Sequence, residues 1–222
     1  MTDSIVWQLV MKDLRVAWPL ALGALVLGVL SLALSPWSAA AFFVGGSVLI
    51  VSLVLLNVML VSMSIVGERK DKVRLFMLSM PVSTTQYNVS KLLSSLIAYV
   101  VPAVLLTFAG VGLLLATPLP DAFIPLFVAT SVHCFLYFCV FLAVALVTDS
   151  QGWITTVIVC GNVSISFVIP GLINFTSLRG TLDAEAVVWA PDVVAFIAIE
   201  LVLAAAALAI SFAVNSRKTE FV

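Results

Sequence analysis

Two ionisable side chains lie deep inside apolar stretches of the sequence. Glu200 follows Asp192 by eight residues, and His133 is near the middle of another apolar stretch. A charge at such depth in a membrane helix costs roughly 2.5–3.5 kcal/mol, so ionisable residues there often mark substrate or proton paths. We therefore predict that Glu200 and His133, with Asn57 and Asn162, contribute to a substrate path. The alternative is that these side chains hydrogen-bond to neighbouring helices and only fix their packing.

Motifs for covalent or metal chemistry are missing from the sequence. There is no Gly-Lys-Ser or Gly-Lys-Thr phosphate loop, no Gly-x-Ser-x-Gly elbow, and a single histidine excludes the two-histidine metalloprotease motif. The three cysteines lie in apolar runs without disulfide or metal spacing: Cys134, Cys139 and Cys160. We predict no catalytic residue and no metal site. An intramembrane enzyme using Glu200 and His133 as acid and base stays an alternative, although nothing in the sequence shows that they touch.

The composition excludes a soluble domain. Of the 222 residues, 63% are hydrophobic and 9% are charged, and the mean hydropathy is +1.26. Soluble domains are about 45–50% apolar and about 25% charged. The formal charge of -1 also leaves no basic surface for nucleic acid. We predict a protein whose main solvent is the lipid bilayer.

Six apolar stretches are long enough to cross a membrane as helices, which needs roughly 20 residues each. We place them at residues 18–34, 41–66, 92–116, 123–147, 154–176 and 193–214. Turn-forming residues separate them, such as Ser35-Pro36 and Ala190-Pro191. The runs are too long for barrel strands and do not alternate with period two. The predicted fold is a single all-α transmembrane domain over residues 1–222.

The basic residues predict the orientation, because short cytoplasmic loops retain Lys and Arg. With the N-terminus inside, Arg179 is the one basic residue on the outer side, in the extracellular loop 177–192. The other nine become cytoplasmic: Lys12, Arg15, Arg69, Lys70, Lys72, Arg74, Lys91, Arg217 and Lys218. Both chain ends are then cytoplasmic.

Residues 4–17 before the first span have an amphipathic pattern. Gln8, Lys12 and Arg15 form a polar stripe with helical spacing. This predicts a helix on the membrane surface, with a bend at Pro19 into the first span. An ordinary charged leader that only sets topology is the alternative. A cleaved signal peptide fits poorly, because the apolar run exceeds the usual 7–15 residues.

The segment 67–91 between the second and third spans combines charge with an apolar face. Six of the seven residues from Glu68 to Arg74 are charged: Glu68, Arg69, Lys70, Asp71, Lys72 and Arg74. Val73, Phe76, Met77 and Met80 then recur with helical spacing, and Pro81 disfavours further helix. A solvated basic loop would explain the charges alone. The apolar face predicts a short cytoplasmic helix that binds a groove on another protein.

This arrangement resembles the type 2 ABC transporter permeases, in particular compact bacterial exporters of peptides, antibiotics and lipid-like molecules. The matching residues are Glu68, the run Leu78 to Ser83, and Lys91, within six spans preceded by an amphipathic segment. The resemblance implies that the helix from Glu68 to Met80, with Pro81 at its end, is the coupling helix that docks on a cytoplasmic ATPase. The N-terminal segment becomes an elbow helix. A large extracellular domain and a fused ATPase are missing, so the resemblance leaves the substrate open.

The implied function is the membrane subunit of an ATP-driven exporter in the cytoplasmic membrane of a bacterium. ATP and Mg would bind to separate ATPase subunits rather than to this chain, and a second permease copy or a homologous sister chain would complete the transporter. The largely uncharged spans favour an apolar or amphipathic substrate. A secondary transporter or a structural membrane subunit without an ATPase is the alternative, but the two halves of the chain show no convincing inverted repeat.

Overall fold

The computed structural model describes residues 2–68, 84–175, 177–180 and 186–217. This part of the chain contains six long α-helices and no strand. The helices are α1 (Thr2–Leu34), α2 (Ala39–Val61), α5 (Thr84–Ala116), α6 (Phe123–Val147), α7 (Gln151–Phe175) and α8 (Pro191–Arg217). Each one is long and apolar enough to cross a membrane. The predicted all-α fold with six spans is confirmed.

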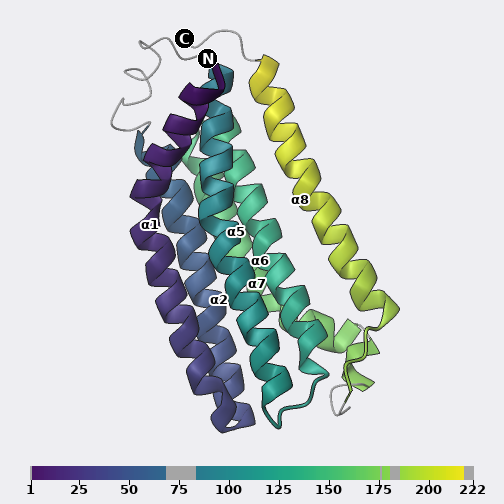
Figure 1. The fold of residues 1–222 in the computed structure, drawn as a ribbon. Coiled ribbons are helices and arrows are strands. Elements are labelled where there is room, and N and C mark those ends of the chain that lie inside the picture. The colour runs from purple at the N-terminus through teal and green to yellow at the C-terminus, as the bar shows by residue number, and fades with distance from the viewer. Residues whose placement is uncertain (1, 69–83, 176, 181–185, 218–222) are drawn as a thin grey trace.

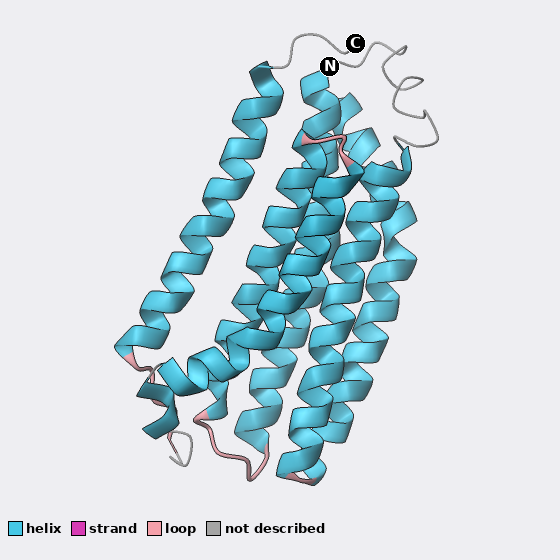
Figure 2. Ribbon diagram, turned by 180° about the vertical axis from the view of Figure 1, so that it is seen from behind, coloured by secondary structure: helices cyan, strands magenta, loops and turns pink. Residues whose placement is uncertain are grey.

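The helices run up and down in one elongated bundle. Figure 1 shows that α1 begins and α8 ends at the same end of the bundle, which we call the terminal end. The residues that flank segment 69–83 also lie there, as does the short connection from α6 to α7 (Figure 2). The connections from α1 to α2 and from α5 to α6 lie at the opposite end. The bundle therefore places the described charged residues Lys12, Glu68 and Lys91 at the terminal end.

The first helix differs from the expected elbow followed by a separate span. The helical structure of residues 4–17 is present, but α1 continues through Pro19 as one helix. Proline removes one backbone hydrogen bond and bends a helix without always ending it. Figure 1 shows α1 changing direction in its upper part. The third helix likewise begins at Thr84, well before the predicted span at 92–116.

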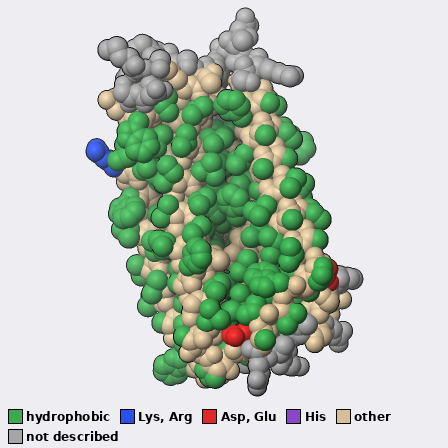
Figure 3. Space-filling model, turned by 45° about the vertical axis from the view of Figure 1, so that its right-hand side comes forward, with side chains coloured by type: hydrophobic (Ala, Val, Ile, Leu, Met, Phe, Trp, Pro, Cys, Tyr) green, Lys and Arg blue, Asp and Glu red, His purple; other side chains and the backbone are tan. Residues whose placement is uncertain are grey.

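The central helix of the bundle is α6. Its side chains Phe138, Phe141 and Leu142 are fully buried, and Phe138 stacks on Tyr99 of α5 with ring centroids 4.1 Å apart. Helix α1 packs mainly against α5 and α2, and α8 packs mainly against α6. On the face drawn in Figure 3, apolar side chains are spread over the whole length of the bundle, and the few charged side chains that are visible lie in its upper and lower parts. This distribution suits a lipid environment.

Two short elements modify the helix ends. The second span closes with a π-helical segment, η2 (Ser62–Gly67), directly before Glu68. Single π-turns in membrane and soluble helices are rare and often occur at functional sites. Between α7 and α8, the described residues form one 3-10 turn, η3 (Ser177–Gly180). An Asp192 carboxylate oxygen accepts a 2.6 Å hydrogen bond from the Ser177 backbone N–H, which ties η3 to the start of α8.

Candidate functional site

A buried lysine lies at the terminal end of the bundle, between two carboxylates. Lys91 of α5 has a 2% exposed side chain. Its Nζ lies 2.9 Å from Oδ2 of Asp13 on α1 and 2.7 Å from Oε1 of Glu68, which follows η2. A buried ammonium is stable only when it is paired and hydrogen-bonded. The three side chains therefore form a single ionic unit that joins three segments distant in sequence.

Further polar groups complete this unit. Tyr87 donates a 2.9 Å hydrogen bond to Oε2 of Glu68, and Lys12 lies 3.5 Å from Oε1 of the same carboxylate. Lys12 also lies 3.6 Å from Oδ1 of Asp13. Two ammonium groups thus balance two carboxylates. We call Lys12, Asp13, Glu68 and Lys91 the ionic cluster.

The environment of Glu68 favours its charged form. Burial raises the pKa of this carboxyl, but hydrogen bonding and charge attraction from Lys91, the Tyr87 hydrogen bond and the charge of Lys12 together outweigh burial. The net result is a pKa below the ordinary value of 4.5. Glu68 therefore remains ionised at neutral pH and holds Lys91 by charge.

The ionic cluster lies at both ends of the segment expected to form the coupling helix. Glu68 directly precedes residues 69–83, and Lys91 lies about two helical turns beyond them on α5. The remaining predicted docking residues fall in that segment, outside the described residues: Arg69, Lys70, Asp71, Lys72, Arg74, Phe76, Met77, Met80 and Pro81. Because Asp13 belongs to α1, a displacement of this segment would pull on α1 and α5 together.

The two ionisable residues at depth come together in the structure. His133 Nδ1 of α6 lies 2.5 Å from Glu200 Oε1 of α8, and His133 Nε2 lies 3.1 Å from Ser164 Oγ of α7. Both members of the pair are largely buried, with side-chain exposures of 14% and 6%. One polar chain therefore joins three helices within the apolar interior.

This arrangement matches the order of groups in a carboxylate–histidine–serine triad. Nucleophilic catalysis also needs hydrogen-bond donors aimed at the oxyanion that develops. Ser164 donates its own hydrogen to the carbonyl of Gly161 at 2.8 Å, and it lies within α7, whose backbone N–H groups bond within the helix. We therefore interpret Glu200, His133 and Ser164 as a hydrogen-bonded link between α8, α6 and α7 that also offers polar groups for binding.

The other two substrate-path candidates do not join this pair in the described part of the chain. Asn57 of α2 is buried, and its amide N and O have no hydrogen-bond partner among the described residues. Asn162 lies on an exposed face of α7 and donates a 2.7 Å hydrogen bond to the carbonyl of Ile158. Its Nδ2 also lies 3.5 Å from the hydroxyl of Tyr137. The four predicted residues thus occupy three separate places.

Asn162 belongs to a polar stripe along the exposed face of α7. Thr155, Thr156, Asn162, Ser166 and Asn174 are all exposed. Each donates a hydrogen bond to the carbonyl four residues earlier, over 2.7–3.2 Å. The hydroxyl donors are therefore satisfied inside the helix, while the side-chain oxygens remain available as acceptors.

Sequence reasoning missed Asp13 and Ser164. Asp13 is the one acidic residue between Asp3 and Glu68, and an isolated acid beside apolar residues is a signal for a buried partner. That signal was available in the sequence, although its partner Lys91 was not identifiable from it. Ser164 carries no comparable signal, because serines are frequent in α7.

The comparison with known protein families matches most of the chain. The family described as ABC-2 family transporter protein matches residues 32–190. No curated protein matches the chain. The match covers the second to fifth spans and both flanks of segment 69–83, including Glu68 and Lys91 of the ionic cluster. The chain therefore belongs to the ABC-2 family of transporter membrane proteins, and it is a multi-pass membrane subunit of that family.

Proposed function

We propose that this chain is the permease subunit of an ATP-driven exporter, powered by ATPase subunits on separate chains. The observation that supports this function best is the ionic cluster. It joins both flanks of segment 69–83 to α1. A membrane subunit that is moved by a partner bound at this segment needs such a connection to its spans. Export as the direction is carried over from the resemblance to compact type 2 exporters.

In this proposal, segment 69–83 is the coupling helix. Closure of the ATPases on ATP moves the segment, and the Glu68–Lys91 and Asp13–Lys91 ion pairs pass the movement to α5 and α1. Such a change is a two-state transition biased by a ligand on a partner subunit. Buried, paired charges suit this role, since they are costly to separate and so keep the joined helices moving together.

A second copy of the chain, or a sister chain, faces α7 in the assembled transporter. The support is the exposed polar stripe from Thr155 to Asn174, which is a poor surface to place against lipid tails. Between two subunits, the same stripe would line a path. The surrounding apolar side chains favour an apolar or amphipathic substrate over a highly charged one.

The charge distribution supports the proposed orientation. Lys12, Arg15 and Lys91 lie at the terminal end of the bundle, and the positive-inside rule favours a cytoplasmic location for that end of a protein in the cell membrane. In this orientation both termini are cytoplasmic, and segment 69–83 is on the side of the membrane where a soluble ATPase would bind.

The test is purification of the tagged chain from its native host in a mild detergent, followed by identification of proteins that copurify in near-equal amount. We expect a soluble ATPase. Reversing the charges of Arg69, Lys70 and Arg74 to Glu should remove it, because the docking helix would then repel its partner. Reversing Arg217 and Lys218 to Glu is the control, since these residues lie on the same side of the membrane and outside the coupling segment.

Purification of the chain alone, under conditions that keep other membrane complexes intact, would contradict the exporter function. It would favour a secondary transporter or a structural subunit. Equal loss of the ATPase in the test variant and the control variant would contradict the coupling role of segment 69–83. Membrane fractionation of each variant shows whether the chain is still inserted.

A further inference from the structure

An apolar groove lies on the outside of the bundle between α1 and α5. These two helices both begin at the terminal end and pack side by side (Figure 1). The volume of the groove is about 370 Å³, whereas an apolar cavity that holds benzene measures about 150 Å³. Among the described residues that line the groove, Arg15 is the one charged side chain. The groove therefore has room for an apolar chain and a positive charge beside it.

The shape of the groove suits a chain that lies along the helices. Its floor contains the small, buried side chains of Ala21 and Ala98, and its sides include the exposed Val101 and Leu105. On α1 the lining extends ten residues from Arg15 to Leu25, which is about 15 Å at the rise of an α-helix. One leaflet contributes about half of the roughly 30 Å hydrocarbon core of a bilayer. The groove therefore matches the depth of a single leaflet.

Exposed tryptophans place the groove relative to the membrane surface. Trp18 and Trp37 are 59% and 84% exposed and 19 residues apart, about 28 Å along a helix. That distance matches the roughly 30 Å hydrocarbon core, and tryptophan is enriched at both of its boundaries. Trp18 also lines the groove. Arg15, about one helical turn nearer the terminal end, is therefore at the depth of lipid headgroups, and the rest of the groove is at the depth of acyl chains.

The guanidinium of Arg15 is free to bind an anion. Lys12 pairs with Asp13 and Glu68, and Asp13 also pairs with Lys91. Arg15 is exposed and takes no part in these ion pairs or in any other within the part of the chain that the structure describes. A guanidinium matches the geometry of a phosphate group and binds it through two parallel hydrogen bonds.

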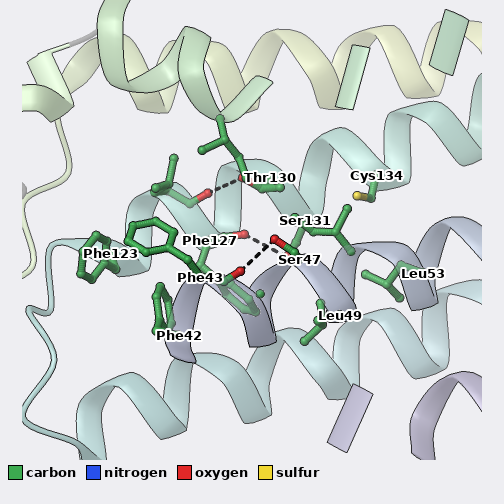
Figure 4. Close-up of a pocket in the computed structure, with 14 residues that line it drawn as sticks. Phe42, Phe43, Ser47, Leu49, Leu53, Phe123, Phe127, Thr130, Ser131 and Cys134 are labelled. Atoms are coloured by element: carbon green, nitrogen blue, oxygen red, sulfur yellow. Dashed lines mark hydrogen bonds between the residues drawn. The ribbon is translucent and has the colours of Figure 1, made fainter. Parts of the chain in front are cut away.

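Two other hollows of the bundle lack this combination. A groove of about 370 Å³ between α6 and α8 has Trp153 in its lining but no charged residue among the described ones. The pocket between α2 and α6, drawn in Figure 4, measures about 70 Å³ and has no charged residue in its described lining either. Its Ser47 and Ser131 hydroxyls already donate to the carbonyls of Phe43 and Phe127.

We propose that the groove between α1 and α5 binds an anionic glycerophospholipid from the leaflet at the terminal end. One acyl chain lies along the floor of the groove, and the phosphate accepts hydrogen bonds from Arg15. The lipid contacts the same two helices that the Asp13–Lys91 ion pair joins, so it holds α1 against α5. This inference goes beyond the proposed transport function, because it requires neither an ATPase nor a transported substrate.

The test measures the dissociation constant of the first bound lipid by native mass spectrometry of the full-length chain, purified in a neutral detergent. The probes are dioleoyl phosphatidylglycerol and dioleoyl phosphatidylcholine, which have the same acyl chains and differ in net charge. We expect phosphatidylglycerol to bind about fivefold more tightly, which corresponds to the roughly 1 kcal/mol that one basic residue contributes beside anionic lipid.

Three substitutions test the headgroup contact. Arg15→Gln should abolish the preference for phosphatidylglycerol, because the phosphate loses its charged partner. Arg15→Lys keeps the charge and should keep most of the preference. Arg217→Gln is the control, since it removes the same charge from α8, outside the lining of the groove, and should leave the preference unchanged.

A matched pair of variants tests the groove itself. Val101 of α5 lines the groove and is 49% exposed, whereas Val104 of the same helix is 44% exposed and does not line it. Val101→Trp should fill the groove and abolish the preference, because the acyl chain can no longer hold the headgroup beside Arg15. Val104→Trp adds the same bulk to α5 and should preserve the preference.

Equal binding of the two lipids to the wild-type chain would overturn the proposal, as would a preference that survives Arg15→Gln or Val101→Trp. Inorganic phosphate at millimolar concentration should not displace phosphatidylglycerol, because it has no acyl chain for the groove. Displacement would mean that Arg15 binds free anions rather than a lipid. These measurements use the chain without an ATPase, so their outcome is independent of the copurification experiment.

Discussion

Lys91 Nζ lies 2.7 Å from Glu68 Oε1, so the residue that enters segment 69–83 is joined by an ion pair to the helix that follows it. This ion pair joins the two flanks of the segment to each other. Asp13, 2.9 Å from the same nitrogen, adds α1 to this closure. The stability of the terminal end of the bundle should therefore depend on Lys91 far more than on any other basic residue there.

Replacing Lys91 with Met should destabilise the chain strongly. The change leaves the Asp13 and Glu68 carboxylates close together without their buried counter-charge, and loss of one partner of a buried ion pair costs about 3–5 kcal/mol. Thermal unfolding in detergent, followed by tryptophan fluorescence, measures the effect. Lys12→Met is the matched control. Its side chain is 45% exposed, so we expect a change below about 1 kcal/mol. Similar losses in both variants would contradict the central role of Lys91.

The unfolding midpoint should depend on pH through Glu68. Its pKa is lowered from 4.5 in the folded chain, so its contribution to stability is fully present above that value and is lost as the pH falls through the lower, folded pKa. Glu68→Gln should therefore reduce stability at neutral pH, with the difference from wild type shrinking as the pH falls below 4.5. Parallel curves of unfolding midpoint against pH for the two proteins would show that ionisation of Glu68 contributes nothing to the stability of the fold.

Substitutions of Glu200 should separate hydrogen bonding from packing at the His133 contact. Glu200→Leu removes the partner of a buried imidazole, which we expect to cost about 1–3 kcal/mol of folding stability. Glu200→Gln keeps a hydrogen-bonding group of similar size and should cost much less. The measurement is the unfolding midpoint in detergent of the two variants side by side. A leucine variant as stable as the glutamine variant would mean that the link between α6 and α8 is apolar in nature.

Gly161 on α7 is expected to be sensitive to a single added methyl group. A Cβ atom there would overlap the ring of Tyr137 on α6, and such overpacking typically costs about 1–3 kcal/mol. Gly171→Ala in the same helix is the control, because its Cβ would meet nothing within 4 Å. We expect the control to be neutral or slightly stabilising, since alanine favours helix over glycine. Equal unfolding midpoints for both variants would contradict close packing of α6 on α7.

The number and type of the spans were predictable, because a run of about 20 apolar residues crosses a lipid bilayer as an α-helix, which satisfies its backbone hydrogen bonds internally. Glu68 and Lys91 were identified through the family resemblance. The ion pair between Lys91 and Asp13 was not, since Asp13 lies 78 residues before Lys91 and apolar periodicity does not fix which faces of two helices meet. The same reason hid the contact between His133 and Glu200. Spans that are apolar on all sides give no indication of how each helix is rotated.

The continuity of α1 was also outside the reach of sequence reasoning. Pro19 lies where the amphipathic segment is followed by the apolar span, and this position predicts a helix boundary. Helix α1 nevertheless continues through Pro19. Neighbouring helices stabilise such a residue in a bundle, and that support is a property of the packed structure rather than of the local sequence.

The π-helical segment Ser62–Gly67 gives this chain a place where one residue can be lost without turning Glu68. A π-turn closes its hydrogen bonds over five residues instead of four, so η2 holds more chain per turn than the rest of the second span. Deleting one residue between Val61 and Glu68 would let the segment wind as an ordinary α-helix, because a π-turn holds one residue more than an α-turn. Glu68 would then keep its direction around the helix axis and its ion pair with Lys91. Deleting one residue from the regular helix α2 would instead turn Glu68 by about 100° around the axis, so a length change there should be far more damaging than one in η2.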